Sequence, residues 1–278
     1  MLTIPPEQTE ARLTNNNEII VIKLGGSVIS SKDSAVQSIV GLQKSGRRIV
    51  VVHGGASLVN KWLAAQGISS EFRQGERVTD AKSLEVVTAV LAGLANKETT
   101  AAIIDAGGKA AGISGADGGM IQAKVRDAKL GYLGDVVRVD TGILETLLKD
   151  GFIPVVSPIS FNAVGRTPQD PLLLNINGDA VAGAIAAELR AQQLVFLTDV
   201  DGVRDSEGKV ILQLGLDEIE SLLASGTAYG GMIPKLRACL KAARAGTTCR
   251  IADGRVPGAT DGAISGSFTG STVKAVRS

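Results

Sequence analysis

Two glycine pairs follow apolar runs in a way that is typical of anion-binding turns. The run over residues 19–24 ends at Gly25-Gly26, and the run over residues 48–52 is followed, after one histidine, by Gly54-Gly55. A helical pattern comes after each pair. A strand, a glycine turn and a helix in this order direct free backbone N–H groups beyond the carboxyl end of the strand. We therefore predict that both turns face one anion site, although each turn taken alone is equally consistent with an ordinary tight turn.

Two lysines and one aspartate have positions that suit such a site. Lys23 interrupts the first apolar run, and because burial of an unpaired ammonium is costly, it must reach either an anion or the protein surface. Lys235 follows Pro234 at the start of a predicted helix, where a cation opposes the helix dipole unless an anion binds there. Asp179 opens another predicted helix, where an acid is favourable. A solvated lysine and a simple first-turn acid are the alternatives for the last two.

The elements that position these residues alternate between strands and helices. Strands are predicted over residues 19–24, 48–52 and 152–156, and short runs at 121–124 and 136–139 suggest a hairpin laid over one end of the sheet as a lid. The predicted helices carry apolar residues on one face, and these are Val36, Ile39 and Val40; Leu58, Val59, Trp62 and Leu63; Leu84, Val87, Leu91 and Leu94; and, after an N-cap at Asp140, Ile143, Leu144, Leu147 and Leu148.

The second half of the chain continues the same pattern. Its predicted strands cover residues 172–176, 194–197 and 248–252, and its predicted helices cover 179–189, the surroundings of 219–223, and a segment that begins near Pro234. Strands that alternate with helices predict an α/β fold, here a three-layer αβα sandwich with a central, mostly parallel sheet. We expect two lobes of one unit, over residues 1–173 and 174–278.

Composition excludes several classes of protein. The 278 residues carry 29 basic and 28 acidic side chains, and no basic run or aromatic series suited to nucleic acid is present. The apolar runs have the length of strands, and the N-terminus lacks a signal-peptide pattern, so neither a membrane span nor secretion is expected. Cys239 and Cys249 lack metal-binding spacing and there is one histidine, which favours reduced thiols in a cytoplasmic protein and no zinc site.

Seven segments identify the chain more closely than its glycine turns do. There is no GxxxxGK[ST] loop, and no GxGxxG follows a strand. From about residue 18 to about residue 272 the chain resembles the acetylglutamate kinase family of the amino-acid kinase superfamily. The segments that carry the resemblance are Ile22-Lys-Leu-Gly-Gly26, Val52-His-Gly-Gly55, Gly75-Glu-Arg-Val-Thr-Asp80, Leu174-Asn-Ile-Asn-Gly-Asp179, Leu197-Thr-Asp-Val-Asp-Gly202, Gly230-Gly-Met-Ile-Pro-Lys235 and Asp253-Gly-Arg-Val-Pro257.

The resemblance implies a reaction and a catalytic set. ATP would phosphorylate the side-chain carboxylate of N-acetyl-L-glutamate, as in arginine biosynthesis. Lys23 and Lys235 would contact the phosphoryl group from its two sides, Asp179 would hold both lysines, and Gly26 and Gly55 would supply N–H donors. Phosphoryl transfer passes through a loose, highly charged transition state, so its catalysis is mostly positioning and charge stabilisation. Two lysines and backbone N–H donors are suited to that task.

The resemblance also assigns ATP to the second lobe. Mg²⁺ would accompany ATP through its phosphates and water rather than through a protein cage, so no protein metal site is expected. The aspartate-rich loop that would embrace the nucleotide does not have the EF-hand spacing. The implied nucleotide-binding residues are Asp199, Val200, Asp201, Gly202, Val203 and Arg204, together with Thr227, Ala228 and Tyr229.

The first lobe would bind the acceptor and form a homodimer. The resemblance gives the main chain of Gly54 and Gly55, Arg77 and Asn175 as its contacts, and a guanidinium with a neutral amide is a sensible grip for a carboxylate. A carboxylate with a pKa of about 4.3 is already ionised at neutral pH, so no general base is needed. His53 is therefore expected to anchor its turn by hydrogen bonding rather than to move protons.

Some features leave alternatives open. Ala56 stands where a third glycine is frequent, and Glu76 stands where an apolar residue is usual. A kinase for an aminoadipate side chain attached to a carrier protein is the nearest rival, while aspartate, carbamate and uridylate kinases fit the central segments less well. A catalytically silent binding or regulatory subunit is opposed by the presence of Lys23, Asp179 and Lys235. The short, polar segment 1–17 favours a dimer that is insensitive to arginine.

Overall fold

The computed structural model describes residues 18–26, 32–73 and 76–275. The prediction that rests on residues 1–17 therefore lies outside the described part of the chain. No helix within the described ranges has the length and apolar character needed to cross a bilayer.

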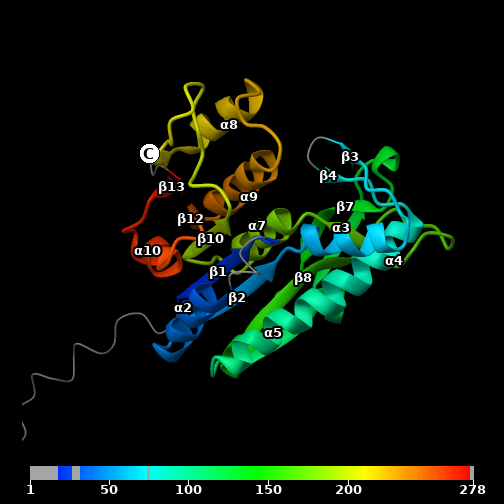
Figure 1. Cartoon of the computed structure of the whole chain (residues 1–278), viewed down its shortest axis with the longest axis horizontal. Coiled ribbons are helices and arrows are strands. Elements are labelled where there is room, and N and C mark those ends of the chain that lie inside the picture. Colours follow the sequence, from blue (N-terminus) through cyan, green and yellow to red (C-terminus); the bar gives the residue numbers. More distant parts are fainter. Residues whose placement is uncertain (1–17, 27–31, 74–75, 276–278) are drawn as a thin grey trace, which may run out of the picture.

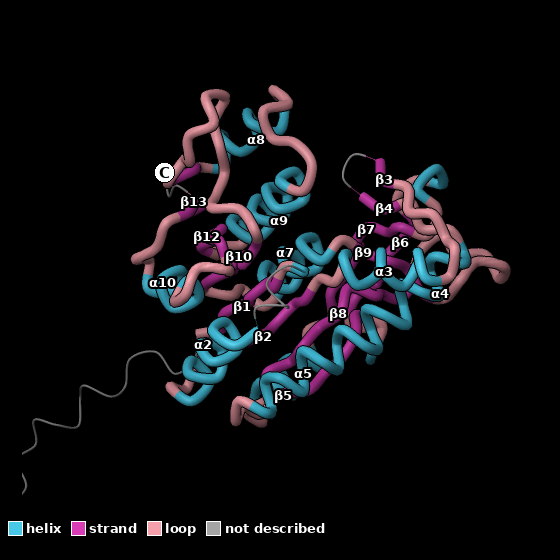
Figure 2. Tube along the Cα trace, viewed as in Figure 1, coloured by secondary structure: helices cyan, strands magenta, loops and turns pink. Residues whose placement is uncertain are grey.

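One sheet of eleven strands runs through the described residues (Figures 1 and 2). Its centre is parallel, because β10 and β2 both pair with β1 in the same direction and β8 continues this order on the far side of β2. β12 extends the parallel part beyond β10, and β5 pairs with β8. The central strands are β1 (Ile19–Leu24), β2 (Arg48–His53), β5 (Ala110–Gly115), β8 (Ile153–Asn162), β10 (Gln193–Thr198) and β12 (Thr248–Asp253).

Antiparallel pairs complete both ends of this sheet. At one end β13 (Gly270–Val273) runs antiparallel to β12 and pairs with the short β11 (Gln213–Leu214). At the other end β6 (Ile121–Val125) and β7 (Leu133–Val139) form the predicted hairpin. That hairpin does not lie over the sheet as a lid, because β6 pairs with β8 and β7 pairs with β9 (Leu173–Ile176). It extends the sheet instead.

Helices cover both faces of the sheet and bury its central strands. On one face the core contains Val21, Val50 and Phe196, and on the other it contains Ile22, Val51 and Leu197. Because alternate residues of one strand enter opposite cores, these strands read as continuous apolar runs. The helices are α2 (Lys32–Lys44), α3 (Ala56–Ala65), α4 (Ala81–Thr88), α5 (Asn96–Asp105), α6 (Gly142–Lys149), α7 (Gly178–Glu188), α8 (Leu216–Ala224), α9 (Met232–Arg244) and α10 (Ala259–Ser265).

Three sequence predictions about these helices need correction. A π-helical segment, Ala89–Ala95, joins α4 to α5, so the predicted third helix is longer and less regular than its apolar pattern indicated. Trp62 is 44% exposed, because α3 buries only the stripe that contains Val59 and Leu63. Asp140 accepts a hydrogen bond from the Gly142 N–H, but the N-cap position belongs to Thr141.

The two lobes remain a prediction. The strands β10, β12, β13 and β11, all from the second half of the chain, lie together at one end of the sheet (Figure 1). They join the first half through the continuous β1–β10 pair, and β9, which contains the predicted boundary, belongs to the opposite end.

Candidate active site

The two glycine turns lie in contact at the carboxyl ends of β1 and β2. Leu24 is paired in register with His53, so both strands end at the same level. A methyl group placed on Gly26 would lie 3.6 Å from the backbone nitrogen of Ala56 and 3.7 Å from that of Gly55. The prediction that both turns face one site therefore agrees with their placement.

Asp179 bridges the two lysines. Its Oδ1 lies 2.7 Å from Lys23 Nζ, and its Oδ2 accepts a hydrogen bond of 3.0 Å from Lys235 Nζ. The side chains are buried, with exposed fractions of 5% for Asp179, 10% for Lys23 and 12% for Lys235. Lys23 and Lys235 are 156 and 56 positions from Asp179 in the sequence. The three side chains thus form one buried cluster of two cations and one anion, with net charge +1.

Local structure fixes each member of this cluster. β1 carries Lys23 to its carboxyl end, and α9 carries Lys235 in its first turn. Asn177 caps α7 and its side-chain oxygen accepts the N–H of Asp179 at 2.8 Å. Burial alone would raise the pKa of Asp179, but the two lysines outweigh burial and hold this pKa below its usual value. The carboxylate is therefore charged at neutral pH.

A pocket of about 200 Å³ opens beside the cluster. This volume lies below the usual range for drug-sized ligands, which suits a small metabolite. The wall of the pocket contains seven of the eight predicted acceptor and catalytic residues. These seven are Lys23, Gly26, Gly54, Gly55, Arg77, Asn175 and Asp179. The eighth, Lys235, does not line it but pairs with Asp179, which does.

Arg77 is held in this wall by three neighbours. Its Nη1 donates to Ser70 Oγ at 2.7 Å, and its Nη2 donates to Asn60 Oδ1. Its guanidinium lies over the ring of Phe72, 4.7 Å from the centroid. Burial lowers the pKa of Arg77 below its usual value, and a group so basic stays charged. The side chain is thus a fixed cation on one side of the pocket.

The orientation of the Asn175 amide follows from Thr79. The Thr79 hydroxyl donates its one hydrogen to the Arg77 carbonyl oxygen at 3.2 Å, so it can only accept from Asn175 Nδ2, 3.1 Å away. This leaves Asn175 Oδ1 for another donor, and in the described part of the chain no group donates to it. The pocket therefore offers a cation from Arg77 and a hydrogen-bond acceptor from Asn175.

Glu76 brings a carboxylate to the same pocket, where this charge is paired with a guanidinium. Arg126, from the segment after β6, forms an ion pair with Glu76 and a second one with Asp135, whose Oδ1 lies 2.7 Å from Arg126 Nε. The acid that replaces a usual apolar residue is thus matched by a basic partner from the β6–β7 hairpin.

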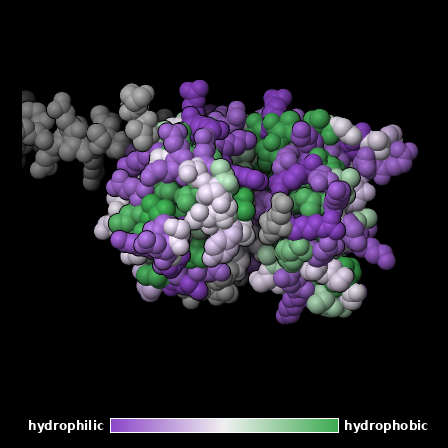
Figure 3. Space-filling view, turned by 90° about the horizontal axis from the view of Figure 1, so that it is seen from above, coloured by the Kyte–Doolittle hydropathy of each residue, from purple (hydrophilic) through white to green (hydrophobic). Residues whose placement is uncertain are grey.

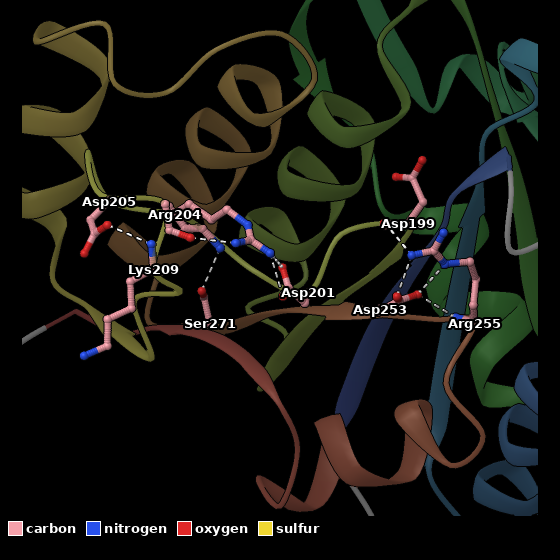
Figure 4. Close-up of polar contacts among 10 residues, drawn as sticks. Asp199, Asp201, Arg204, Asp205, Lys209, Asp253, Arg255 and Ser271 are labelled. Atoms are coloured by element: carbon pink, nitrogen blue, oxygen red, sulfur yellow. Dashed lines mark hydrogen bonds and ion pairs between the residues drawn. The ribbon is translucent and has the colours of Figure 1, made fainter.

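The predicted nucleotide segment at 199–204 lies on the loop beyond β10 (Figure 4), and the one at 227–229 lies between α8 and α9. Arg204 donates to both carboxylate oxygens of Asp201, at 2.8 and 2.9 Å, and Arg255 donates to the carbonyl oxygen of Asp199 at 2.8 Å. Val203 and Ala228 are buried, and the Val203 N–H already donates to Ser271 Oγ. The side chains of these two residues are therefore part of the loop interior, and Gly202 is buried as well. Asp199, Val200, Arg204 and Tyr229 are exposed, and Asp201 and Thr227 are half-buried.

A groove separates the two halves of the surface (Figure 3). It has a volume of about 680 Å³ and is lined on one side by residues such as Arg73 and Lys129 and on the other by Pro234, Arg237 and Lys241. It runs past the start of α9, where Lys235 lies.

The described residues contain no group of three His, Cys, Asp or Glu side chains suited to a metal ion. Both oxygens of Asp179 face lysines, and Glu76 faces Arg126, so neither carboxylate of the pocket is open to a cation. A divalent ion would fit this site only if phosphate oxygens carried it.

Several residues of the site carried no signal in the sequence. Asn60 and Ser70, which hold Arg77, are common polar residues outside the seven segments. Thr79, which holds Asn175, lies within the segment from Gly75 to Asp80, but no role was predicted for it there. Asn96, buried beneath the second turn, lies within an apolar helical pattern and was not predicted as part of the site. His53 anchors its turn as expected, with Nδ1 2.8 Å from the Gly54 carbonyl oxygen.

Known proteins resemble this chain in sequence and in fold. The pattern of the amino acid kinase family matches residues 18–253. An acetylglutamate kinase of Dehalococcoides mccartyi (strain CBDB1) is 51% identical over 243 residues, which are 87% of this chain and 89% of that protein. An acetylglutamate kinase of Jannaschia sp. (strain CCS1) is 42% identical over 248 residues, covering 88% and 85% respectively.

Solved structures agree in fold. The protein smu.665 from Streptococcus mutans UA159 has a TM-score of 0.79 at 26% identity, over 92% of this chain and 98% of that one. The N-acetylglutamate synthase from Neisseria gonorrhoeae shares the fold, with a TM-score of 0.77 at 23% identity over 94% of this chain and 60% of that one. The α/β fold predicted from the sequence is thereby confirmed. The chain belongs to the amino acid kinase family, among its acetylglutamate kinases.

Proposed function

We propose that this protein transfers the terminal phosphoryl group of ATP to the side-chain carboxylate of N-acetyl-L-glutamate, in the second step of arginine biosynthesis. The products are N-acetyl-L-glutamyl 5-phosphate and ADP. The observation that carries the proposal is the Lys23–Asp179–Lys235 cluster, buried beside a small pocket that holds Arg77 and Asn175. Relatives named acetylglutamate kinase at 42–51% identity support the choice of acceptor.

In this mechanism a carboxylate oxygen of the acceptor attacks the γ-phosphorus of ATP. The bond from this phosphorus to the bridging oxygen breaks, and its electron pair leaves with ADP. Lys23 and Lys235 stabilise the charge on the oxygens in flight, and Asp179 keeps both ammonium groups in place without neutralising them fully. The N–H groups of Gly26 and Gly55 add donors from the two turns. No proton is transferred, because the acceptor is already ionised.

The acceptor would be held by its charge and its acetamido group. Arg77 suits the α-carboxylate, since a guanidinium already fixed by Asn60 and Ser70 loses little freedom on binding. Asn175 Oδ1 suits the acetamido N–H, which is a single donor. A free amino acid would instead place an ammonium near Arg77, where like charges repel.

ATP would bind to the second lobe, over residues 174–278, through the loops at 199–204 and 227–229. Mg²⁺ would enter on the phosphates and would offset their charge. The first lobe, residues 1–173, would bind the acceptor together with Asn175 from just beyond the boundary, and would form the interface of a cytoplasmic homodimer.

The rival acceptor, an aminoadipate side chain on a carrier protein, needs a pocket open to a long attachment. A silent binding subunit would not need two lysines and an aspartate buried at one point, since their unequal charge costs stability.

Trapping of the acyl phosphate tests the proposal. Enzyme, ATP, Mg²⁺ and N-acetyl-L-glutamate are incubated with hydroxylamine, which converts an acyl phosphate to a hydroxamate. We expect the hydroxamate in proportion to ADP. ADP release without hydroxamate would mean that water, not the carboxylate, accepts the phosphoryl group, and no ADP release would reject the kinase assignment.

A further inference from the structure

A chain of buried polar groups lies behind the second glycine turn and is not used by the mechanism above. His53 ends β2 and Asn96 opens α5, and both residues are completely buried. Asn96 Nδ2 lies 3.2 Å from His53 Nε2, and His53 Nδ1 lies 2.8 Å from the Gly54 carbonyl oxygen. The two side chains therefore connect a helix to the turn.

The orientation of the Asn96 amide is fixed by two strands. Its Nδ2 donates to the carbonyl oxygens of Val155 in β8, at 2.8 Å, and of Ile113 in β5, at 3.1 Å. Its Oδ1 accepts from Lys97 Nζ at 3.1 Å. The reverse orientation would place Oδ1 against two carbonyl oxygens, so Nδ2 is the atom that faces His53. Its two hydrogens lie among three acceptors, so one hydrogen is shared between a carbonyl oxygen and His53 Nε2. Nε2 can therefore only accept, because a proton on it would point at an NH₂ group that offers no acceptor.

This contact determines the protonation of the ring. With Nε2 as acceptor, His53 is neutral, carries its proton on Nδ1 and donates it to the Gly54 carbonyl oxygen. Burial lowers the pKa of His53 to about 4; the bond to Gly54 opposes this shift, and the charges of Lys23 and Lys97 add to it. The ring is therefore a fixed donor throughout the neutral range.

The hydrogen bond from His53 Nδ1 sets the direction of the Gly54–Gly55 peptide group. The Gly54 C=O and the Gly55 N–H belong to the same planar trans peptide and point to opposite sides. A bond that holds the carbonyl on the His53 side therefore turns the N–H away from it, toward the pocket that Gly55 lines. In the described part of the chain no group accepts this N–H.

The π-helical segment packs against Gly55 of the second glycine turn. Gly55 has φ 157° and ψ 24°, and a methyl group on it would lie 2.8 Å from Leu91 Cδ2 and 3.7 Å from Ala95 Cβ. The segment Ala89–Ala95 thus packs on the turn, and Asn96 follows it directly. Short π-helical segments inside helices are frequent at functional sites.

We propose that His53 and Asn96 are positioning residues that hold the Gly54–Gly55 peptide so that the Gly55 N–H points at the oxygens of the transferring phosphoryl group. Asn96 selects the ring tautomer, His53 holds the carbonyl, and the peptide presents the donor. This role rests on the proposed function, but its structural half is open to a test that does not involve activity.

The first experiment observes the ring directly. His53 is the only histidine of the chain, so in protein without a histidine tag long-range ¹H–¹⁵N spectra report on this residue alone. We expect a protonated Nδ1 and an unprotonated Nε2 from pH 6 to pH 8, with no titration in that range. A proton on Nε2, or a titration midpoint near 6.5, would overturn the inference.

The second experiment separates positioning from packing. In His53→Asn the amide nitrogen is as many bonds from Cα as Nδ1 is, so this variant can keep the donor, whereas His53→Leu cannot. We expect kcat within about threefold of wild type for His53→Asn and at least about tenfold lower for His53→Leu, with the ATP KM within about twofold in both. Equal losses in both variants, or a normal kcat in His53→Leu, would contradict the role.

Matched variants in α5 control for general damage. Asn96→Leu should lower kcat by a factor similar to His53→Leu, and the double variant should add little, because both break the same chain of bonds. Thr99→Val removes an equally buried hydrogen bond, from Thr99 Oγ1 to the Ala95 carbonyl oxygen, without touching His53, and kcat should stay near wild type. If wild-type protein fails to phosphorylate N-acetyl-L-glutamate, the proposed function is wrong, while the spectra still decide the tautomer.

Discussion

Removal of the Asp179 carboxylate should affect stability and catalysis together. In Asp179→Asn the shape of the side chain is kept, but the two lysines face different oxygens of Asp179. The amide oxygen therefore replaces only one of these acceptors, and the amide NH₂ faces the other ammonium. Two buried cations remain, with side chains only 10% and 12% exposed, and at least one has no acceptor within the cluster.

The size of the effect follows from this burial. Loss of one partner from a buried ion pair costs about 3–5 kcal/mol, whereas an exposed pair contributes about 0–1 kcal/mol. We therefore expect the free energy of unfolding in urea at pH 7 to fall by about 3–5 kcal/mol. Asp135→Asn is the matched control, because Asp135 pairs with Arg126 but is 44% exposed, and its loss should stay below about 1 kcal/mol.

Catalysis should fall for the same reason. The ammonium groups would no longer be directed at the phosphoryl oxygens, so kcat measured by coupled ADP release should drop at least about a hundredfold. The control variant should keep its kcat within about twofold. A stable Asp179→Asn variant with near-normal kcat would show that the carboxylate neither pairs the lysines nor orients them, which would refute the reasoning.

The remaining predictions use the same two assays. Lys23→Ala and Lys235→Ala should each lower kcat at least about a hundredfold, since in the proposed mechanism each ammonium acts on the transition state, and a near-normal kcat in either removes that lysine from the mechanism. Arg77→Ala should mainly raise the KM for the acylated amino acid, because its grip is similar in ground and transition states, and a change confined to the ATP KM would place the wrong substrate beside it. Acid should destabilise the wild type through His53: its folded pKa of about 4 lies below its unfolded value of about 6.5, so the unfolded state binds the extra proton between these values, and about 2 kcal/mol should be lost between pH 7 and pH 5. His53→Asn should lose less over the same interval in urea titrations, and an equal loss would mean that other groups cause it.

The central strands were predictable because their chemistry is uniform. β1 was predicted with the bounds that the structure gives, since residues 19–24 are apolar on both faces and end at a glycine pair. β5 was missed because Ala110–Gly115 carries two glycines and little apolar bulk. Its glycines serve close packing rather than a turn, as a methyl group on Gly112 would lie 2.3 Å from Asn96 Oδ1. Such a contact is a property of the assembled fold.

The candidate site could be predicted only in part. Lys23 was a candidate from its position alone, but its pairing with Asp179 joins residues 156 positions apart, and only the resemblance brought them together. The hairpin β6–β7 was predicted as a hairpin and misplaced as a lid, because local pattern does not determine which strand a hairpin pairs with. Asn60, Ser70 and Asn96 have roles that depend entirely on which groups the fold places beside them.

Acceptor choice is the most direct test of the central claim. Coupled ADP release is measured with N-acetyl-L-glutamate, L-glutamate, L-aspartate and carrier-linked aminoadipate, each at several concentrations with saturating ATP and Mg²⁺. A site built from Arg77, the Asn175 amide oxygen and the two glycine turns should turn over N-acetyl-L-glutamate rapidly and the other three compounds at least about a hundredfold more slowly in kcat/KM. Comparable kcat/KM with L-glutamate, or a preference for the carrier-linked substrate, would contradict the account.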